Sequence, residues 1–415
     1  MISYFRRLLC TALVSASAAL CVSCSGSGRH AASLPPQACA AVDSTVLAAI
    51  GDGIVPGAVV CVVKGDEIAY LKAYGNRQTV PDTLEMTADA VFDLASLSKC
   101  VGTTPAAMKL IEEGLISPDD RVDTYFPDFL PWSDSSDVVP ITVRHLMTHS
   151  SGVDAYSNVP RCVELYGEDC PDSLMKHIAT RTGRHFRPGS DFLYSCLNFV
   201  TLQNIIQKVT GERLCDYVQR EVFEVLGLEH TSYLTRERTD SLAGAPIVPT
   251  EVQEDGLPLL GQVHDPLARR LNGGNSGNAG VFSNAEDLAV VCAVMMNGGS
   301  LPKRSPLNRT GHTLKLLEPA TVSLMATVPD SNDPKVGRAL GWDVCSSHSG
   351  ICGTVLPSSG HRILCHTGYT GTSIVMDLDS RTAVILLANR VHPEDKGGLK
   401  PTRAALSDIV FAAEM

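Results

Sequence analysis

The stretch VFDLASLSKC, from Val91 to Cys100, places Ser96 three residues before Lys99. If Ser96 begins a helix, Lys99 lies one turn later on the same face. A serine hydroxyl needs a base at neutral pH, and a lysine that loses its hydration can share or accept that proton. The N–H groups at a helix start can also stabilise a developing oxyanion. The spacing fits a serine nucleophile, but serine is also a common helix N-cap, and about one or two chance matches are expected in such a chain.

Two further motifs follow. PGSDFLYSCLNF places Tyr194 just before an amphipathic helix, and LCHTGYTG places His366-Thr367-Gly368 at the start of a C-terminal strand. With the Ser-x-x-Lys spacing, these motifs stand in the order that is typical of the serine β-lactamase and penicillin-binding protein superfamily. The chain resembles its class C-like branch, which includes D,D-carboxypeptidases, D-aminopeptidases and esterases. The resemblance extends over most of the mature chain, with similar segments at residues 141–153, 221–234, 263–299 and 387–393.

The resemblance implies roles for individual residues. Ser96 is expected to be the nucleophile that forms an acyl-enzyme, and Lys99 to accept or relay its proton. Tyr194 is expected to act with Lys99 as general base and later as acid to the leaving group. A tyrosinate beside a lysine ammonium is electrostatically favoured, so the pair can work near neutral pH. The backbone N–H groups of Ser96 and Tyr369 are expected to form the oxyanion hole, with Tyr369 on the strand after Gly368.

The resemblance also implies a substrate-binding strand. His366 and Thr367 are expected to line the pocket and to hydrogen-bond the substrate, often at a carboxylate. Gly368 has no side chain, which lets a substrate backbone lie along the strand up to Tyr369. Two plainer interpretations stay open, with His366 as an ordinary strand residue and Tyr194 as a core aromatic.

Two departures from the family pattern bear on the substrate. Many members carry Tyr-x-Asn, whose amide faces the substrate's acyl side chain and the active-site lysine, but here the third position is Cys196. A thiol is a poor hydrogen-bond partner, and Asn198 substitutes for the amide as a substrate contact only if the local backbone differs. Class C β-lactamases carry Lys-Thr-Gly where this chain has His366, and histidine is mostly neutral at pH 7. Both departures argue against an efficient β-lactamase.

Apolar patterning predicts strands at both ends of the chain and helices between them. Residues 57–75 and 372–389 each have two β-prone runs around a turn. Helical spacing is found at 198–211, 285–299 and 402–415. We therefore expect an α/β fold, more closely α+β, of the β-lactamase/transpeptidase type. In it an antiparallel sheet formed from both chain termini is flanked by helices, and a mainly helical insertion encloses the active site with it.

The N-terminus has the layout of an export signal. MISYFRRLLCTALVSASAALCVSC has two arginines, a short apolar run and then small residues, although a buried N-terminal helix is the alternative. Its end resembles a bacterial lipoprotein cleavage site with Cys24 as the lipidated residue, but Cys21 stands where leucine is usual. We expect a signal peptide at 1–23, a tether at 24–38 and the hydrolase domain at 39–415. The protein is thus predicted to be exported to the cell envelope and lipid-anchored, facing the periplasm or the exterior.

The predicted export of the protein makes disulfide bonds between its cysteines possible. Of the 14 cysteines, Cys10 and Cys21 lie in the predicted signal and Cys24 is the predicted lipidated residue, which leaves eleven in the rest of the chain. Exported proteins can form disulfides, so Cys162/Cys170 and Cys345/Cys352, which are close in sequence, are candidate pairs. The alternative is that many of these thiols are small buried apolar residues.

The predicted function is a serine hydrolase, either an esterase or a D-amino-acid-specific peptidase, with a small-molecule or peptide substrate. The net charge of −11 argues against a general nucleic-acid binder. His145 and His149 have helical spacing but no third ligand at fitting spacing, so they are expected to brace a loop, and no metal or other cofactor is predicted. The alternatives are a weak β-lactamase and a catalytically silent penicillin-binding sensor or scaffold. Silent relatives usually lose the nucleophile, lysine or tyrosine, and all three are present here.

Overall fold

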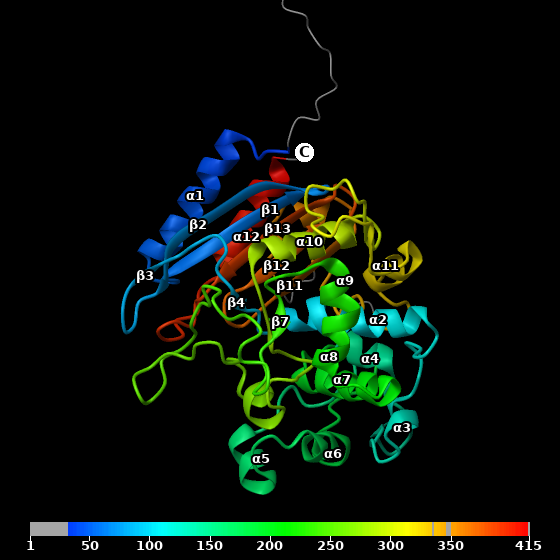
Figure 1. Ribbon diagram of the computed structural model, residues 1–415. Coiled ribbons are helices and arrows are strands. Elements are labelled where there is room, and N and C mark those ends of the chain that lie inside the picture. Colours follow the sequence, from blue (N-terminus) through cyan, green and yellow to red (C-terminus); the bar gives the residue numbers. More distant parts are fainter. Residues whose placement is uncertain (1–31, 334–335, 346–349, 414–415) are drawn as a thin grey trace, which may run out of the picture. The chain divides into compact units, whose positions relative to one another are not determined.

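The computed structural model describes residues 32–333, 336–345 and 350–413, and Ala32–Met415 form one compact unit (Figure 1). The predicted signal at 1–23 and Cys24 lie outside the described residues. Helix α1 (Pro36–Gly51) begins inside the segment expected to be a tether. Among the described residues, no helix combines the length and apolarity needed to cross a bilayer.

A six-stranded antiparallel sheet joins the two ends of the chain. Its strand order is β11-β12-β13-β1-β2-β3. The strands are β1 (Gly57–Lys64), β2 (Glu67–Gln78), β3 (Leu84–Glu85), β11 (Ile363–Thr367), β12 (Ser373–Asp377) and β13 (Thr382–Ala388). The N-terminal strand β1 pairs with the C-terminal strand β13, with Ala58 opposite Ala388. The predicted sheet and both hairpins are confirmed.

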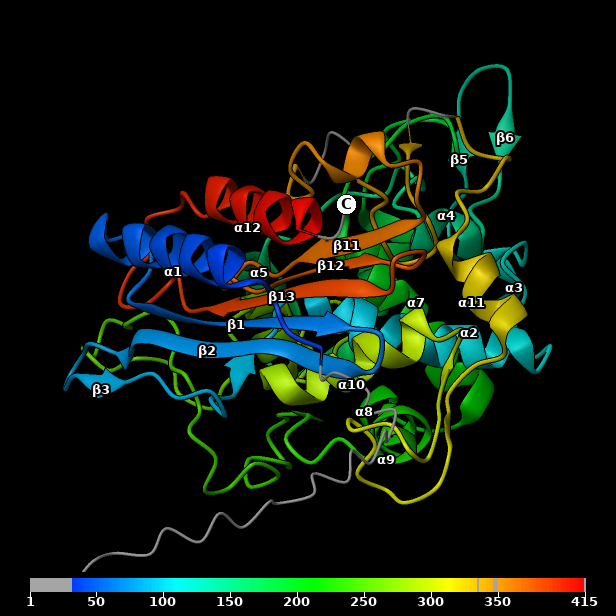
Figure 2. The same cartoon turned by 90° about the horizontal axis from the view of Figure 1, so that it is seen from above.

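Both faces of this sheet are covered, because successive side chains of a strand point to opposite faces. Val59, Cys61 and Val63 of β1 pack into the large core that includes α10 (Ala285–Met296). Their neighbours Ala58, Val60 and Val62 pack into a second core with α1 and the C-terminal helix α12 (Lys400–Ala412). Figure 2 shows α1 and α12 side by side over one face of the sheet. The expected helices at 285–299 and 402–415 are therefore present with shifted ends.

The middle of the chain is helical, as expected. It contains α2 (Thr104–Glu112), α3 (Val122–Tyr125), α4 (Val143–Met147), α5 (Val159–Tyr166), α6 (Pro171–Arg181), α7 (Cys196–Thr210), α8 (Leu214–Val218) and α9 (Glu224–Leu226). Helix α7 begins after Ser195, whose side chain accepts the Asn198 N–H, and ends at Gly211 with a left-handed φ of 73°. This helix confirms the prediction for 198–211 and extends it by two residues at its start.

Short strands connect the helical part to the sheet part. A three-stranded sheet pairs β4 (Phe92–Asp93), β8 (Val281–Ser283) and β7 (Ser232–Tyr233) in the order β4-β8-β7. The remaining elements are β5 (Trp132–Ser133), β6 (Val138–Val139), β9 (Ser300–Leu301), β10 (Leu314–Lys315) and α11 (Pro319–Ala326). The pairing of β4 with β8 fixes the backbone that leads into Ser96.

The His-Thr-Gly motif does not begin a strand. His366 and Thr367 are the last two residues of β11, and Tyr369 lies in the turn that leads to β12. The prediction that the motif starts the C-terminal strand, with Tyr369 on that strand, was wrong. The hairpin signal at 372–389 belongs to β12 and β13, and the five-residue β11 precedes it.

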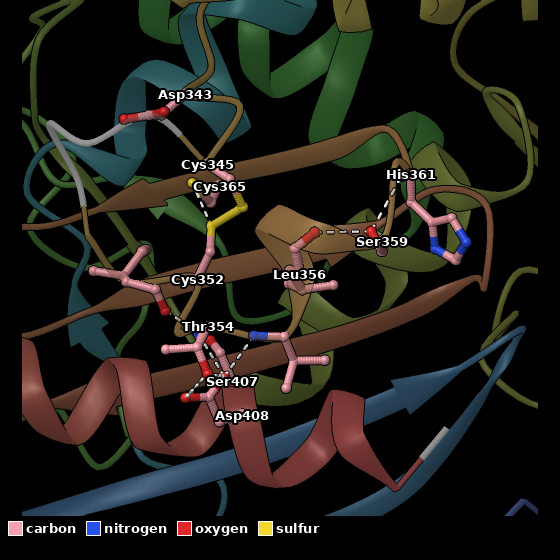
Figure 3. Close-up of a disulfide and its surroundings, with 12 residues drawn as sticks. Asp343, Cys345, Cys352, Thr354, Leu356, Ser359, His361, Cys365, Ser407 and Asp408 are labelled. Carbon is pink, nitrogen blue, oxygen red and sulfur yellow. Dashed lines mark hydrogen bonds between the residues drawn. A yellow bond between two sulfur atoms is a disulfide. The ribbon is translucent and has the colours of Figure 1, made fainter. Parts of the chain in front are cut away.

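One of the two candidate disulfides is present. Cys345 and Cys352 are bonded, with Cα atoms 5.7 Å apart, and the Cys365 sulfur lies 3.5 Å from that of Cys352 (Figure 3). The other candidate pair was a wrong prediction, because Cys162 and Cys170 are separate buried thiols in the large core. Burial raises the pKa of both thiols. Both residues therefore behave as small buried apolar residues, which was the alternative to a disulfide.

The bond between Cys345 and Cys352 closes a short loop and should stabilise the fold. Replacing both residues with serine is expected to lower the free energy of unfolding by about 2 kcal/mol, because the unfolded chain regains the entropy of that loop. Urea unfolding measures the change. Peptide mapping after alkylation in denaturant without reductant is the control, and it should find Cys162 and Cys170 alkylated. A linked Cys162–Cys170 peptide would contradict the finding that these two cysteines are free thiols.

Candidate active site

Ser96 lies where the chain leaves β4 and turns into a helix. The preceding residue, Ala95, has a φ of 46°, which L-residues adopt rarely. The buried carboxylate of Asp93 accepts the Ala95 N–H at 2.8 Å and the His264 N–H at 2.6 Å. After Ser96 the chain winds in a wide turn over Lys99–Thr103, where the Thr104 N–H bonds to the Lys99 carbonyl, and continues as α2. The expected helix start after Ser96 is therefore present.

Lys99 is fully buried and points back at Ser96. Its Nζ lies 3.0 Å from Ser96 Oγ, 2.9 Å from the Asn278 carbonyl oxygen and 3.8 Å from Cys196 Sγ. Three acceptors match the three N–H bonds of an ammonium group. Sequence reasoning missed Asn278, because its contribution is a backbone carbonyl. The only signal for it was the glycine-rich stretch NGGNSGNAG in which it lies.

Tyr194 stands immediately before the N-cap residue of α7 and faces Lys99. The Lys99 Nζ lies 5.1 Å from the centre of the Tyr194 ring. The Tyr194 hydroxyl is buried and makes no hydrogen bond within the described part of the chain. Burial raises the pKa of Tyr194, and the positive charge of Lys99 opposes that rise. The structure therefore brings together the three residues that the sequence assigned to catalysis.

Lys99, Cys196 and Tyr194 alter one another's pKa values. Burial by itself lowers the pKa of Lys99, but Cys196 and Tyr194 outweigh it, so that the pKa is raised. Burial likewise raises the pKa of Cys196, against the effect of Lys99. At neutral pH this favours an ammonium beside a neutral thiol and a neutral phenol. The ammonium in turn stabilises a phenolate on Tyr194 whenever one forms.

Two backbone N–H groups are available for an oxyanion. Neither the Ser96 N–H nor the Tyr369 N–H donates a hydrogen bond to any of the residues described. The turn that contains Tyr369 is held from α12, where Arg403 donates to the carbonyls of Gly368 at 3.1 Å and Thr372 at 2.9 Å. The Arg390 guanidinium lies 4.5 Å from the centre of the Tyr369 ring. These contacts of Arg403 and Arg390 fix the turn that carries the Tyr369 N–H.

Gly368 has a steric role that the sequence did not indicate. A Cβ at this position would lie 2.3 Å from the Leu94 carbonyl oxygen and 2.1 Å from Thr372 Oγ1. Thr372 Oγ1 itself donates to the Leu94 carbonyl at 3.0 Å. The missing side chain therefore lets the end of β11 approach the backbone two residues before Ser96. This contact sets the distance between the nucleophile and the Tyr369 N–H.

His366 is a neutral, buried ring beside Tyr194. It is 4% exposed, its Nδ1 is 2.9 Å from the Thr367 carbonyl oxygen, and its ring centre is 5.9 Å from that of Tyr194. Burial, followed by the charges of Arg338 and Lys99, holds the pKa of His366 well below its usual value. Thr367 is half-buried at the strand end. A neutral His366 agrees with the sequence argument that this motif attracts a carboxylate only weakly.

Asn198 does not take the place of the motif amide at Lys99. It is fully buried, and its Oδ1 accepts a hydrogen bond from Ser151 Oγ at 2.7 Å. Its Nδ2 lies 3.5 Å from His149 Nδ1. The backbone of α7 is regular here, so Cys196 faces Lys99 and Asn198 lies further along the helix. The substrate contact predicted for Asn198 has no support in this geometry, because the side chain is engaged in the core.

The two histidines of the segment 141–153 brace it, as expected. His145 Nδ1 accepts the Thr142 N–H at 3.1 Å at the start of α4. His149 Nδ1 accepts the Ser195 N–H at 3.1 Å, and its ring centre lies 4.4 Å from that of Tyr194. Sequence reasoning did not place His149 beside the catalytic tyrosine, because the two residues meet only through the tertiary fold.

Comparison with known proteins decides the family. The family model described as Beta-lactamase matches residues 42–408. The chain belongs to the Beta-lactamase family. A similar relative, from Escherichia coli strain K12, is named "Putative D-alanyl-D-alanine carboxypeptidase". It is 31% identical over an alignment 360 positions long, which covers 81% of this chain and 79% of the relative.

Solved structures of the family share the fold. EstCE1, described as a hydrolase with promiscuous acyltransferase activity, matches with a TM-score of 0.67 and 23% identity over 90% of this chain and 98% of its own. The octameric penicillin-binding protein homologue from Pyrococcus abyssi matches with a TM-score of 0.63 and 20% identity over 90% and 76%. The predicted family, fold and serine hydrolase class are therefore confirmed for this Beta-lactamase family member.

Replacing Gly368 with alanine tests the contact between β11 and the backbone before Ser96. The added methyl group has no room, so we expect a loss of about 1–3 kcal/mol in unfolding free energy and at least a tenfold loss of ester turnover. Gly51→Ala at the end of α1 is the matched control, because a Cβ there meets nothing within 4 Å. Urea unfolding and turnover of an activated ester measure both effects. Wild-type behaviour of Gly368→Ala would show that this approach is not needed.

Proposed function

We propose that this Beta-lactamase family member hydrolyses acyl compounds through an acyl-enzyme on Ser96. The observation that carries the proposal is the 3.0 Å contact between Lys99 Nζ and Ser96 Oγ, with the Tyr194 ring beside the same ammonium. The Lys99 ammonium donates to Ser96 Oγ and stabilises the Tyr194 phenolate that accepts the serine proton, an arrangement that activates a serine nucleophile.

The reaction follows from these groups. Ser96 Oγ attacks the substrate's carbonyl carbon, and its proton passes to the phenolate form of Tyr194, which the Lys99 ammonium stabilises. The carbonyl oxygen becomes an oxyanion that the N–H groups of Ser96 and Tyr369 stabilise. Tyr194 then returns the proton to the leaving oxygen or nitrogen as its bond to the carbonyl carbon breaks. Water attacks the resulting ester, Tyr194 takes its proton, and Ser96 leaves as the alcohol.

The substrate proposed is an ester or a D-amino-acid peptide. The Escherichia coli relative named as a carboxypeptidase supports the peptide, and EstCE1, named as a hydrolase with acyltransferase activity, supports the ester. The neutral His366 and the thiol of Cys196 leave fewer polar contacts for an acyl side chain than the motifs Lys-Thr-Gly and Tyr-x-Asn offer. These two residues also weigh against an efficient β-lactamase. The intact set of Ser96, Lys99 and Tyr194 weighs against a silent sensor.

Ser96→Ala tests the nucleophile. The variant is expected to lose at least about a thousandfold in turnover of activated esters and to gain no adduct from a fluorophosphonate probe, while keeping the wild-type fold. Ser98→Ala is the matched control, because the Ser98 hydroxyl is buried and accepts the Val281 N–H at 3.0 Å. Intact mass and peptide mapping locate the adduct. Turnover by Ser96→Ala, with contamination excluded, would remove Ser96 from the mechanism.

The proposed location is the cell envelope, with a lipid anchor at Cys24. If this is correct, Cys24→Ala expressed in a bacterial host should lose incorporation of an alkyne-tagged fatty acid and should leave the detergent phase. Cys21→Ala is the control and should keep both. An unlabelled wild-type protein in the aqueous phase would rule out the anchor.

A further inference from the structure

Arg338 is a buried cation beside the catalytic tyrosine. It is 3% exposed, and its guanidinium carbon lies 5.9 Å from the centre of the Tyr194 ring and 5.5 Å from that of Phe192. Both distances are within the range of cation–π contacts. A second, permanent positive charge, from a segment distant from Lys99 in the sequence, thus lies beside the Tyr194 ring.

Its pairing with an acid does not account for this position. Arg338 Nη1 is 3.4 Å from Asp343 Oδ2, a long contact for a buried ion pair. The Nε and Nη2 N–H groups are buried and have no hydrogen-bond partner among the described residues. Buried donors without acceptors cost free energy, so a purely structural arginine would be poorly placed here.

His149, next to Tyr194, must stay neutral for the site to keep its geometry. His149 Nδ1 accepts the Ser195 N–H at 3.1 Å, which puts the proton of the neutral ring on Nε2. A second proton would occupy Nδ1 and break the bond that holds Ser195, the residue after Tyr194. His366 Nδ1 faces the Thr367 carbonyl and therefore carries the proton of its own neutral ring.

The two cations lower the pKa values of the two histidine rings. After burial, Arg338 is the strongest influence that lowers the pKa of both His149 and His366, followed by Lys99. Cys196 from α7 acts in the opposite direction and raises the pKa of Tyr194, and Asp265 acts on Lys99 and Cys196. Asp343 offsets part of the charge of Arg338. A positive charge that opposes protonation of the histidines also favours a phenolate on Tyr194.

We propose that Arg338 is a positioning residue whose fixed positive charge beside the Tyr194 ring takes over the electrostatic role of the motif lysine that this chain lacks. It stabilises the Tyr194 phenolate without touching the substrate. The proposal rests on the proposed function, because its main test is turnover through Ser96.

The test is the pH dependence of kcat/KM for an uncharged activated ester. Arg338→Gln should move the acid limb up by about 1 pH unit, a tenfold loss at a fixed pH on that limb, with a similar plateau. Arg338→Lys keeps the charge and should keep the wild-type limb. Asp343→Asn removes the carboxylate that lies 3.4 Å from Arg338, so its limb should stay or move down. A structural ion pair instead predicts that removing either partner lowers turnover at every pH.

The outcomes separate this inference from the proposed function. A wild-type protein with no turnover and no fluorophosphonate adduct would refute the proposed function. The inference itself would then be tested by absorbance titration of the phenolate, with Tyr194→Phe subtracted, and it predicts a higher Tyr194 pKa in Arg338→Gln. An active wild type whose acid limb does not move in Arg338→Gln would overturn the inference alone. If Arg338→Gln does not fold, an upward shift in Asp343→Asn or Arg338→Lys overturns it.

Discussion

The structure of the site depends on burying the ammonium group of Lys99. An ion without solvent is costly unless acceptors surround it. The three acceptors come from the nucleophile turn at Ser96, the start of α7 at Cys196 and the glycine-rich loop at Asn278. These segments are distant in sequence, and the need to satisfy one charge holds them together. The nucleophile, the tyrosine helix and the loop are therefore positioned as a unit.

The second constraint is the close approach of the sheet to that unit. Leu94 and Gly368 come into contact because glycine leaves room, and Thr370 and Thr372 donate to the carbonyls of Asp93 and Leu94. The same turn is held from α12 by Arg403. Because β12 follows this turn and pairs with β13, which in turn pairs with β1, the turn that contains Tyr369 is tied to both ends of the chain. The sheet built from both termini therefore also holds the turn that contacts the backbone before Ser96.

Sequence reasoning succeeded where the signal is local. Ser96 with Lys99, and Tyr194 before a capped helix, are patterns carried by adjacent residues, so their positions at helix starts could be predicted and are confirmed. It failed for His366-Thr367-Gly368, whose strand is too short to show a pattern before the hairpin that follows. It also failed for Cys162 and Cys170, because sequence spacing does not give the direction of two Cβ atoms. Three further residues reach the site only through tertiary packing, and no sequence motif predicts them: Asn278, His149 and Arg338.

The charges around the site indicate that it stabilises negative charge. Lys99 and Arg338 are cations, whereas burial keeps His149 and His366 neutral and raises the pKa values of Tyr194 and Cys196. The surroundings of the reacting atoms are thus positive in a chain whose net charge is −11. In the proposed reaction, negative charge passes from the Tyr194 phenolate to the oxyanion, and fixed charges act on both without rearrangement. Under that proposal, the charge of Arg338 stands in for the motif lysine that this chain lacks.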